Sequence, residues 1–266
     1  MSSVFLVDTY NMLHRARFGF ATGPHAITFN FFRSLRSEFE RHSPSKVYMV
    51  LEGYPIHRVS ESNGEYKANR ERLSDEGFHR QKTEIIELFS HLPVTVKRHP
   101  DFECDDVIAT LARSHSSIGD DVTICSSDTD FIQLLDNDKI QLWNPVKKKF
   151  IEPWPVDYLV WKSLRGDPTD NIPGVAGVGE KTAFKLTADL NLLNEFLERD
   201  LLKKESFESS RRQIRLVNID ESCNKWESSD HEFSEESLYQ EFKDREFSTI
   251  IEKSWPKWIS TMENIK

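Results

Sequence analysis

The chain has 266 residues, of which 38% are hydrophobic and 30% are charged, as is typical of a soluble globular protein. We find no run of about 18 apolar residues that would cross a membrane, and the N-terminal MSSVFLVD lacks the parts of a signal peptide. The three cysteines, Cys104, Cys125 and Cys223, are odd in number and widely spaced. We therefore expect a cytoplasmic, reducing compartment with neither a disulfide framework nor a zinc site.

The net charge of −9 at first argues against a nucleic-acid partner, but the charge is unevenly distributed. Residues 217–266 contain 12 acids and 6 Lys or Arg residues. The preceding residues have a net charge of −3, and nine of their acids are the candidate metal ligands described below. A basic surface around an acidic, metal-filled pocket is compatible with a phosphodiester substrate.

Two apolar runs near the N-terminus predict buried strands that each end in an acid. VFLVD at residues 4–8 ends in Asp8, and KVYMVLE at residues 46–52 ends in Glu52. Asp8 could equally start a turn. Arg15 follows Asp8 by about two helical turns. If both strands belong to one parallel sheet, the two acids share the rim at which ligands bind in α/β folds.

Residues 53–92 form a polar segment that is too long for an ordinary connection. Tyr66 and Phe78 interleave with its basic residues, as in surfaces on which single-stranded bases stack. A solvated helical hairpin is the alternative. The basic residues are Arg58, Lys67, Arg70, Arg72, Arg80 and Lys82.

Acids gather again at residues 102–131. FECDDVIATLA predicts an amphipathic helix with three acids at its start, and DVTICS predicts a strand that leads into two more acids. These five acids are Glu103, Asp105, Asp106, Asp128 and Asp130. Each cluster alone could stabilise a helix dipole or a turn. Together they would repel one another without a cation, and oxygen ligands favour Mg²⁺ or Mn²⁺.

The stretch GDPTDNIPGVAGVGEKTAFKL at residues 166–186 is the most specific in the chain. Asp167 and Asp170 are placed to reach the metal rim. Gly177 and Gly179 predict a tight turn before a helix whose first amides bind a phosphate, with Lys181 beside them. The turn's carbonyls could hold a monovalent cation such as K⁺. A glycine-rich turn that caps two helices explains the glycines but not the paired aspartates.

The last part of the chain predicts helices at 191–216 with a second basic surface, and then an acidic tail whose aromatic residues pack back on the core.

Five motifs together resemble the flap endonuclease / 5′→3′ exonuclease family, which includes stand-alone phage and bacterial enzymes and the nuclease domain of bacterial DNA polymerase I. They are VDTYNMLHR, EYKANR, ECDDVIATLA, SSDTDFIQLL and GDPTDNIPGVAGVGEKTA. The resemblance covers residues 4–186, with a weaker match at 238–251.

The resemblance implies a PIN-like (Rossmann-like) α/β fold with a mostly parallel sheet, helices on both faces, a helical arch and a C-terminal helix-three-turn-helix region. We accordingly expect a nuclease core at 1–155 with the arch as an insert at 53–92. The DNA-binding helix-three-turn-helix region is then 156–216, and 217–266 packs back on the core.

The resemblance also implies roles for single residues. Lys67 and Arg70 match arch bases that engage the scissile phosphate, and Arg15 matches a phosphate-contacting arginine. The matching metal-site acids are Asp8, Glu103, Asp105, Asp106, Asp128, Asp130, Asp167 and Asp170. The family usually has Asp where this chain has Glu52, Gly where it has Thr9, Gly where it has Ser127 and Lys where it has Thr129. These departures concern the fine metal geometry.

We therefore predict a 5′→3′ exonuclease and flap endonuclease that uses two divalent cations to hydrolyse DNA. The first site and its surroundings comprise Asp8, Glu52, Glu103, Asp105 and Asp106; the second comprises Asp128, Asp130, Asp167 and Asp170. Lys67 and Arg70 would neutralise the phosphate, with Asp8 and Asp106 also catalytic.

The expected substrate is DNA with a free 5′ end or flap, with RNA–DNA hybrid as a further candidate, bound by a monomer through Arg15, Tyr66, Gly177, Gly179 and Lys181. A PIN-like ribonuclease, a small-molecule phosphatase and a non-catalytic DNA-binding protein are the alternatives.

Overall fold

The computed structural model describes residues 2–69 and 75–265. Its centre is a seven-stranded sheet in the order β6-β5-β4-β1-β2-β3-β7. The five central strands are parallel, and the two edge strands, β6 and β7, are antiparallel to their neighbours. The strands are β1 (Ser3–Asp8), β2 (Lys46–Val50), β3 (Thr95–Arg98), β4 (Asp121–Cys125), β5 (Ile140–Asn144), β6 (Lys149–Ile151) and β7 (Glu227–Asp230).

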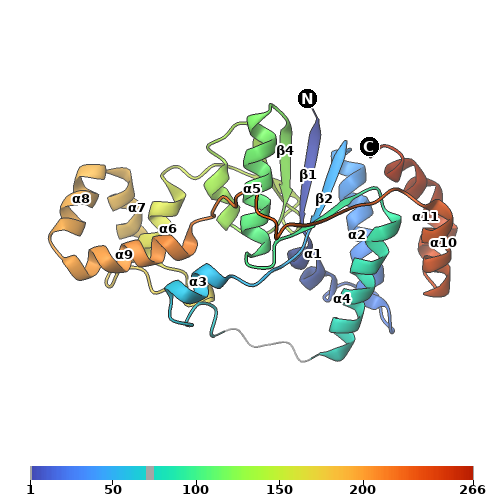
Figure 1. Ribbon diagram of the computed structural model, residues 1–266, viewed down its shortest axis with the longest axis horizontal. Coiled ribbons are helices and arrows are strands. Elements are labelled where there is room, and N and C mark those ends of the chain that lie inside the picture. The colour runs from blue at the N-terminus through green and yellow to red at the C-terminus, as the bar shows by residue number, and fades with distance from the viewer. Residues whose placement is uncertain (1, 70–74, 266) are drawn as a thin grey trace.

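Helices cover both faces of the sheet, which confirms the predicted α/β class (Figure 1). The α-helices are α1 (Thr9–Ala16), α2 (Ala26–His42), α3 (Ile56–Glu61), α4 (Glu76–Leu88), α5 (Cys104–Ser117), α6 (Tyr158–Arg165), α7 (Glu180–Ala188), α8 (Leu190–Glu198), α9 (Leu201–Ile214), α10 (Glu235–Asp244) and α11 (Ser248–Met262). Three short 3₁₀ helices are η1 (Phe89–His91), η2 (Asp130–Leu134) and η3 (Pro168–Asp170).

The side chains of β1 alternate between the two apolar clusters that lie on opposite faces of the sheet. Successive side chains of a strand point to opposite faces. Val4 and Leu6 accordingly pack in the apolar cluster that contains α5 and α6, whereas Phe5 and Val7 pack in the cluster that contains α1, α2, α4, α10 and α11. All four side chains are buried, as a central parallel strand requires.

Part of the long polar segment belongs to the core. Phe78, Ile85 and Leu88 of α4 are buried against α2, so the alternative of a solvated helical hairpin is wrong for this helix. Its buried Glu84 accepts a hydrogen bond from Thr28 (3.0 Å). Phe78, which we expected on a base-stacking surface, is instead 4% exposed.

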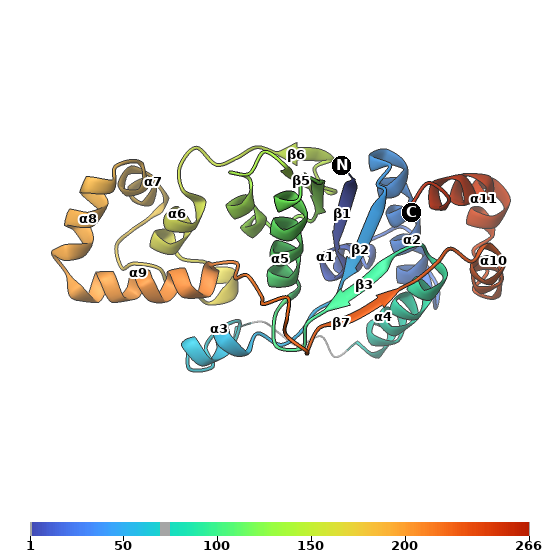
Figure 2. The same ribbon diagram turned by 45° about the horizontal axis from the view of Figure 1, so that its top comes forward.

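The chain leaves the sheet after β6, forms α6 to α9 at one end of the molecule, and returns to the other edge of the sheet as β7 (Figure 2). β7 was not expected from its sequence, and its four residues are all exposed. The last two helices pack on α2, where Phe242 and Trp258 are fully buried.

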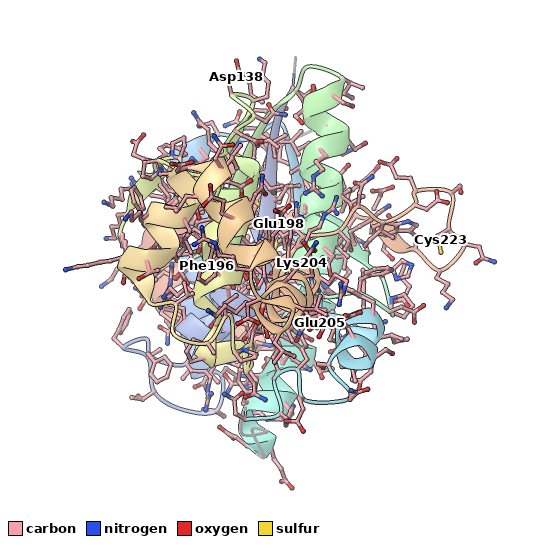
Figure 3. All side chains as sticks on the ribbon, turned by 90° about the vertical axis from the view of Figure 1, so that its left-hand side faces the viewer. Asp138, Phe196, Glu198, Lys204, Glu205 and Cys223 are labelled. Carbon is pink, nitrogen blue, oxygen red and sulfur yellow. The ribbon has the colours of Figure 1, made fainter. Side chains whose placement is uncertain are left out.

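The end of the molecule formed by α7 to α9 carries acidic as well as basic side chains. In Figure 3, Glu198 and Glu205 lie on the same end of the molecule as Lys204. Lys203 covers the ring of Phe196, with its ammonium nitrogen 4.9 Å from the ring centroid.

None of the helices that the structure describes is long and apolar enough to cross a membrane.

Candidate active site at the carboxyl ends of the parallel strands

Asp8 is the last residue of β1, and Glu52 lies just beyond β2, which ends at Val50 rather than at Glu52 as expected. The register of these parallel neighbours places Asp8 beside Val50. The carboxylate of Asp8 accepts hydrogen bonds from the backbone amide of Asn11 (3.0 Å) and the hydroxyl of Ser126 (2.7 Å). Burial raises the pKa of Asp8 to about 6, although these hydrogen bonds lower it, and the charge of Asp128 adds to the rise. The two strands therefore bring their terminal acids to one rim, as predicted from the sequence.

Glu52 and Asp105 complete a group of acids with Asp8 and Asp128. Burial, followed by the charges of Glu103 and Asp8, raises the pKa of Glu52 to about 8. Burial, followed by the charges of Asp128 and Asp8, raises the pKa of Asp105 well above its usual range. None of these four carboxylates forms an ion pair with a basic residue that the structure describes. We call Asp8, Glu52, Asp105 and Asp128 the open acids.

Glu103 is turned toward basic and hydroxyl groups. One carboxylate oxygen accepts hydrogen bonds from Arg58 (2.9 Å) and the Tyr66 hydroxyl (2.9 Å), and the other accepts one from the Lys67 ammonium (2.5 Å). Burial alone would raise the pKa of Glu103, but the charges of Lys67 and Arg58 outweigh it and lower the pKa. Asp170 lies 3.7 Å from Lys67 in the same cluster.

Asp106 pairs with Arg58 in this structure, and its roles as a catalytic residue and metal ligand stay predictions. Its carboxylate is fully buried and accepts two hydrogen bonds from Arg58, at 2.5 and 2.7 Å, and one from the Val217 amide, at 3.0 Å. Consecutive residues of an α-helix point about 100° apart, so the side chains of Asp105 and Asp106 leave α5 in different directions. Asp105 lies near the other three open acids, and Asp106 contacts Arg58.

Asp130 and Asp167 share the ammonium group of Lys162, a buried residue of α6. Lys162 contacts Asp130 and lies 2.7 Å from Asp167. Burial raises the pKa of Asp130 to about 6 despite the charge of Lys162, and the hydrogen bond from Lys162 outweighs burial at Asp167 and lowers its pKa. Burial alone would lower the pKa of Lys162, but the charge of Asp130 reverses this and raises it.

The residues between 2 and 265 that the structure describes contain no ready-made cage of three or more metal-ligating side chains. Five of the nine predicted ligands contact Arg58, Lys67 or Lys162 instead. The open acids nevertheless suit a divalent cation. They offer only oxygen ligands, which hard ions such as Mg²⁺ prefer. The pKa values of Asp8, Glu52 and Asp105 are raised, first by burial and then by neighbouring carboxylates, and a bound cation would offset both effects.

Lys67 lies next to this rim, whereas Arg70, the other predicted phosphate-binding residue, lies outside the described residues. The backbone of Lys67 is left-handed, with φ of 55°, and its amide donates to the carbonyl of Asp170 (3.0 Å). These contacts fix the segment that carries the ammonium group beside Glu103.

Tyr66 is not a surface ring. It is 8% exposed and packs with Ile172 and Ile214, and its hydroxyl donates to Glu103. Burial and the charge of Glu103 raise its pKa. The ring of Tyr66 is therefore buried in this structure, and the stacking of bases on it stays a prediction.

Arg15, which follows Asp8 in α1, is half-buried. Its positive charge lowers the pKa of Glu38 on α2, although burial of Glu38 has the larger, opposite effect. One guanidinium nitrogen of Arg15, Nη1, is buried without a hydrogen-bond partner among the described residues. The phosphate contact of Arg15 stays a prediction.

The glycine-rich turn is open. Gly177 has φ of 78°, Gly179 is the N-cap of α7, and a Cβ atom at either position would meet nothing within 4 Å. Lys181 is exposed in the first turn of α7. The first amides of a helix lack partners within the helix, so this turn presents N–H donors to an approaching anion.

Arg58 and Lys162 are two residues of the site that were not predicted from the sequence. Arg58 was one of several basic residues in a polar segment, and Lys162 lay in a predicted helix without any motif. Nothing in their spacing shows that each pairs with two acids from other parts of the chain.

A mostly parallel α/β sheet with acids along its carboxyl rim, followed by a helical region with a glycine-rich turn, defines a resolvase-like nuclease core with an appended helical module. The model of the 5′-3′ exonuclease N-terminal, resolvase-like domain matches residues 3–158, and that of the 5′-3′ exonuclease C-terminal SAM fold matches residues 154–224. The chain belongs to the 5′-3′ exonuclease family.

Curated relatives and solved structures agree with this assignment. The thermostable DNA polymerase I of Thermus thermophilus is 32% identical over 218 residues, which are 76% of this chain and 26% of the relative. DNA polymerase I of Treponema pallidum is 33% identical over 205 residues, 69% of this chain and 20% of the relative. The chain thus spans about a quarter or less of the length of these relatives.

Among solved structures, a bacteriophage T5 protein co-crystallized with metal ions has a TM-score of 0.68 at 20% identity, covering 80% of this chain and 89% of the other. Flap endonuclease-1 from Methanococcus jannaschii has a TM-score of 0.66 at 14% identity, covering 99% and 93%. At these identities the likeness shows the fold.

Proposed function

We propose that this chain is a divalent-metal-dependent, structure-specific 5′ nuclease that hydrolyses DNA as a 5′→3′ exonuclease and flap endonuclease, and that it removes flaps or RNA primers in DNA replication. The observation that carries the proposal is the group of four open acids at the carboxyl rim of the sheet, in a chain of the 5′-3′ exonuclease family. Uncompensated carboxylates at this place are the ligands that a phosphodiester-cleaving metal site requires.

Asp8, Glu52, Asp105 and Asp128 would hold Mg²⁺ or Mn²⁺. A cation bound there supplies an acidic water and withdraws charge from the phosphate. Asp130, Asp167 and Asp170 are the candidates for a second cation, although they contact Lys162 and Lys67 in this structure. A bacteriophage T5 5′-exonuclease with bound divalent zinc ions has a similar fold, which supports a metal site in this family.

The protein's own residues have three tasks. Asn11 and Ser126 hold the carboxylate of Asp8 in place through hydrogen bonds. Lys67, together with Arg70, would neutralise the negative charge that the phosphate gains during hydrolysis. The amides beside Gly179, with Lys181, would grip a duplex phosphate without reading sequence, and K⁺ would fit the carbonyls of the same turn.

DNA with a free 5′ end or a 5′ flap is the proposed substrate, with RNA–DNA hybrid as a second one, and the monomer as the acting species. The fold also resembles a bacteriophage T5 flap endonuclease in complex with DNA and metal ions, with a TM-score of 0.66, which supports DNA as the substrate. The three free cysteines support action in a reducing compartment such as the cytoplasm.

Labelled substrates test this function. We expect the purified protein to cleave 5′-flap DNA in Mg²⁺ or Mn²⁺, and to lose that activity in EDTA. Asp8→Asn should abolish cleavage, whereas Asp138→Asn, which changes an exposed acid far from the rim, should not. Equal cleavage with and without EDTA would contradict the metal site. Cleavage of single-stranded RNA but not of flap DNA would favour a PIN-like ribonuclease.

A further inference from the structure

Arg58 is a buried arginine whose hydrogen-bonding capacity is fully used. A guanidinium group has five N–H donors, and the side chain of Arg58 is 2% exposed. Nε donates to the carbonyl of Gln213 (2.8 Å), Nη1 to Glu103 (2.9 Å) and Asp106 (2.5 Å), and Nη2 to Asp106 (2.7 Å) and the carbonyl of Arg215 (3.1 Å). Five donors therefore meet five acceptors.

These acceptors come from parts of the chain that are far apart in sequence. Arg58 itself is in α3, which precedes Lys67. Glu103 and Asp106 are at the start of α5, and the two carbonyls are at the C-terminal end of α9, where a positive charge is favourable. In Figure 1, α3 lies beside the C-terminal end of α9 and below α5. Arg58 thus links the SAM-fold region, residues 154–224, to the acids at the start of α5.

The same contacts continue to Lys67. Glu103 shares one carboxylate oxygen between Arg58 and Tyr66 and gives the other to Lys67. If Arg58 were absent, Glu103 and Asp106 would be buried without its charge, which is costly. Lys67 would be the remaining basic partner of Glu103 and would be held more strongly by it, while His57 lies 4.0 Å from Asp106.

We propose that Arg58 is a positioning residue, which sets the place of Lys67 through Glu103 and makes that place depend on the docking of α9. The inference rests on the proposed function, in which Lys67 contacts the phosphate and the SAM-fold region holds the duplex. Because Arg58 bonds to both α9 and Glu103, loss of its contacts to α9 would also disturb Lys67. The rate of cleavage would therefore depend on whether α9, in the region that holds the duplex, is docked against Arg58.

A double-mutant cycle tests the proposal. Arg58→Met, Lys67→Ala and the double variant would be compared with the parental protein in the steady-state kinetics of flap-DNA cleavage. Arg58→Met should lower kcat on the order of 10²-fold, as expected for a misplaced catalytic group, with little change in KM. In the Lys67→Ala background, Arg58→Met should have almost no further effect, because the group that it positions is already gone.

A matched control separates positioning from simple docking. Arg212 and Glu61 form a second ion pair between α9 and α3, at 2.5 Å, which does not include Glu103. Glu61→Gln removes this pair and keeps every basic residue, so kcat should stay within about twofold of the parental value. An equal loss of kcat in Glu61→Gln would overturn the proposal.

Arg58→Met leaves Asp106 buried and uncompensated, and it could unfold the protein. The variant Arg58→Met/Asp106→Leu removes both charges together, which proteins tolerate better, and its cycle with Lys67→Ala should be equally non-additive. If the losses of kcat were additive with Lys67→Ala, or if this variant had the parental kcat, Arg58 would not position Lys67. Either outcome would leave the proposed nuclease function intact. A parental protein that cleaves no DNA substrate would overturn the proposed function and this inference with it.

Discussion

The ammonium nitrogen of Lys162 lies 2.7 Å from a carboxylate oxygen of Asp167. The same ammonium contacts Asp130, and Lys162 is 5% exposed. Two acids that the sequence predicts as metal ligands thus share a buried positive charge that belongs to the protein. This relationship lets the contributions of protein and metal to the site be separated experimentally.

Lys162→Met should lower the stability of the metal-free protein by about 3 kcal/mol, because removing one partner of a buried ion pair leaves the other charges uncompensated. Mg²⁺ should recover part of the loss if Asp130 and Asp167 can then take a cation. Thermal melts in EDTA and in Mg²⁺ measure both effects, with Lys185→Met on the exposed face of α7 as the control. An unchanged melt in EDTA would contradict the importance of this pair.

The open acids predict an unusual dependence of stability on pH. The pKa values of Asp8 and Glu52 are raised to about 6 and about 8, from ordinary values of 3.8 and 4.5. Below the ordinary values both folded and unfolded chains hold these protons. Above the raised values both have lost them, and the folded chain bears the full burial and repulsion of the charges.

The free energy of unfolding of the metal-free protein should therefore fall, by on the order of a few kcal/mol, as the pH rises from about 5 to about 8.5. Denaturant titrations in EDTA across this range measure it. Glu52→Gln should flatten the dependence, and saturating Mg²⁺ should reduce it. Stability that rises steadily with pH over this interval would show that the acids are not held as the structure has them.

Asp105→Asn should separate stability from activity. The pKa of Asp105 is raised well above its usual range, first by burial and then by Asp128. An amide resembles the protonated acid, so the variant should be at least as stable as the parental protein in EDTA. Cleavage of flap DNA should fall on the order of 10²-fold or more, because the neutral group cannot stabilise the bound cation.

The comparison for Asp105→Asn is the shift in Tm when Mg²⁺ is added, with Asp138→Asn as the control. The parental protein and the control should show the shift, and Asp105→Asn should show little of it. A full shift in Asp105→Asn would remove this residue from the metal ligands.

Lys67→Ala should lower turnover on the order of 10²-fold, as expected when one charge that stabilises the transition state is lost. Duplex binding should change much less, because most phosphate contacts lie elsewhere. Gel shifts in Ca²⁺ and cleavage in Mg²⁺ on the same preparation distinguish the two effects. Lys253→Ala, an exposed lysine of α11, is the matched charge control. Parental turnover in Lys67→Ala would refute its contact with the phosphate.

The glycine-rich turn offers two substitutions with different expected outcomes. Gly177 has a left-handed backbone, so Gly177→Ala should cost about 1–2 kcal/mol of stability. Gly179 has φ of −89°, and its Cβ position is empty, so Gly179→Ala should fold normally. Its methyl group would stand at the helix N-terminus and should weaken duplex binding. Normal duplex affinity in Gly179→Ala would argue against a phosphate at this turn.

The sequence was sufficient to predict the central sheet and one part of the rim. The runs that end in Asp8 and Glu52 are apolar enough to identify buried parallel strands, and such strands bring their carboxyl ends together. It was insufficient for β7, whose residues, ESSD, have no apolar alternation. That strand forms because β3 offers an edge in space, which local sequence does not report.

The second feature that could not be predicted from the sequence is which basic residue pairs with which acid. Arg58 and Lys67 are both basic residues of the same polar segment, yet one is buried against α9 and the other lies at the rim. Helical geometry alone would have separated Asp105 from Asp106, because they point about 100° apart. Only the packing of α3, α5 and α9 shows which of them has an arginine as its partner.

The two edge strands have a consequence for association between molecules. β6 is three residues long and begins with Lys149, and β7 is four residues long with Glu227 and Asp230 at its ends. Pairing of either edge with a strand of a second molecule would place these charges in the contact and would gain few hydrogen bonds. Sheet extension is therefore unfavourable on both sides, and the apolar parallel strands at the centre stay enclosed at high protein concentration.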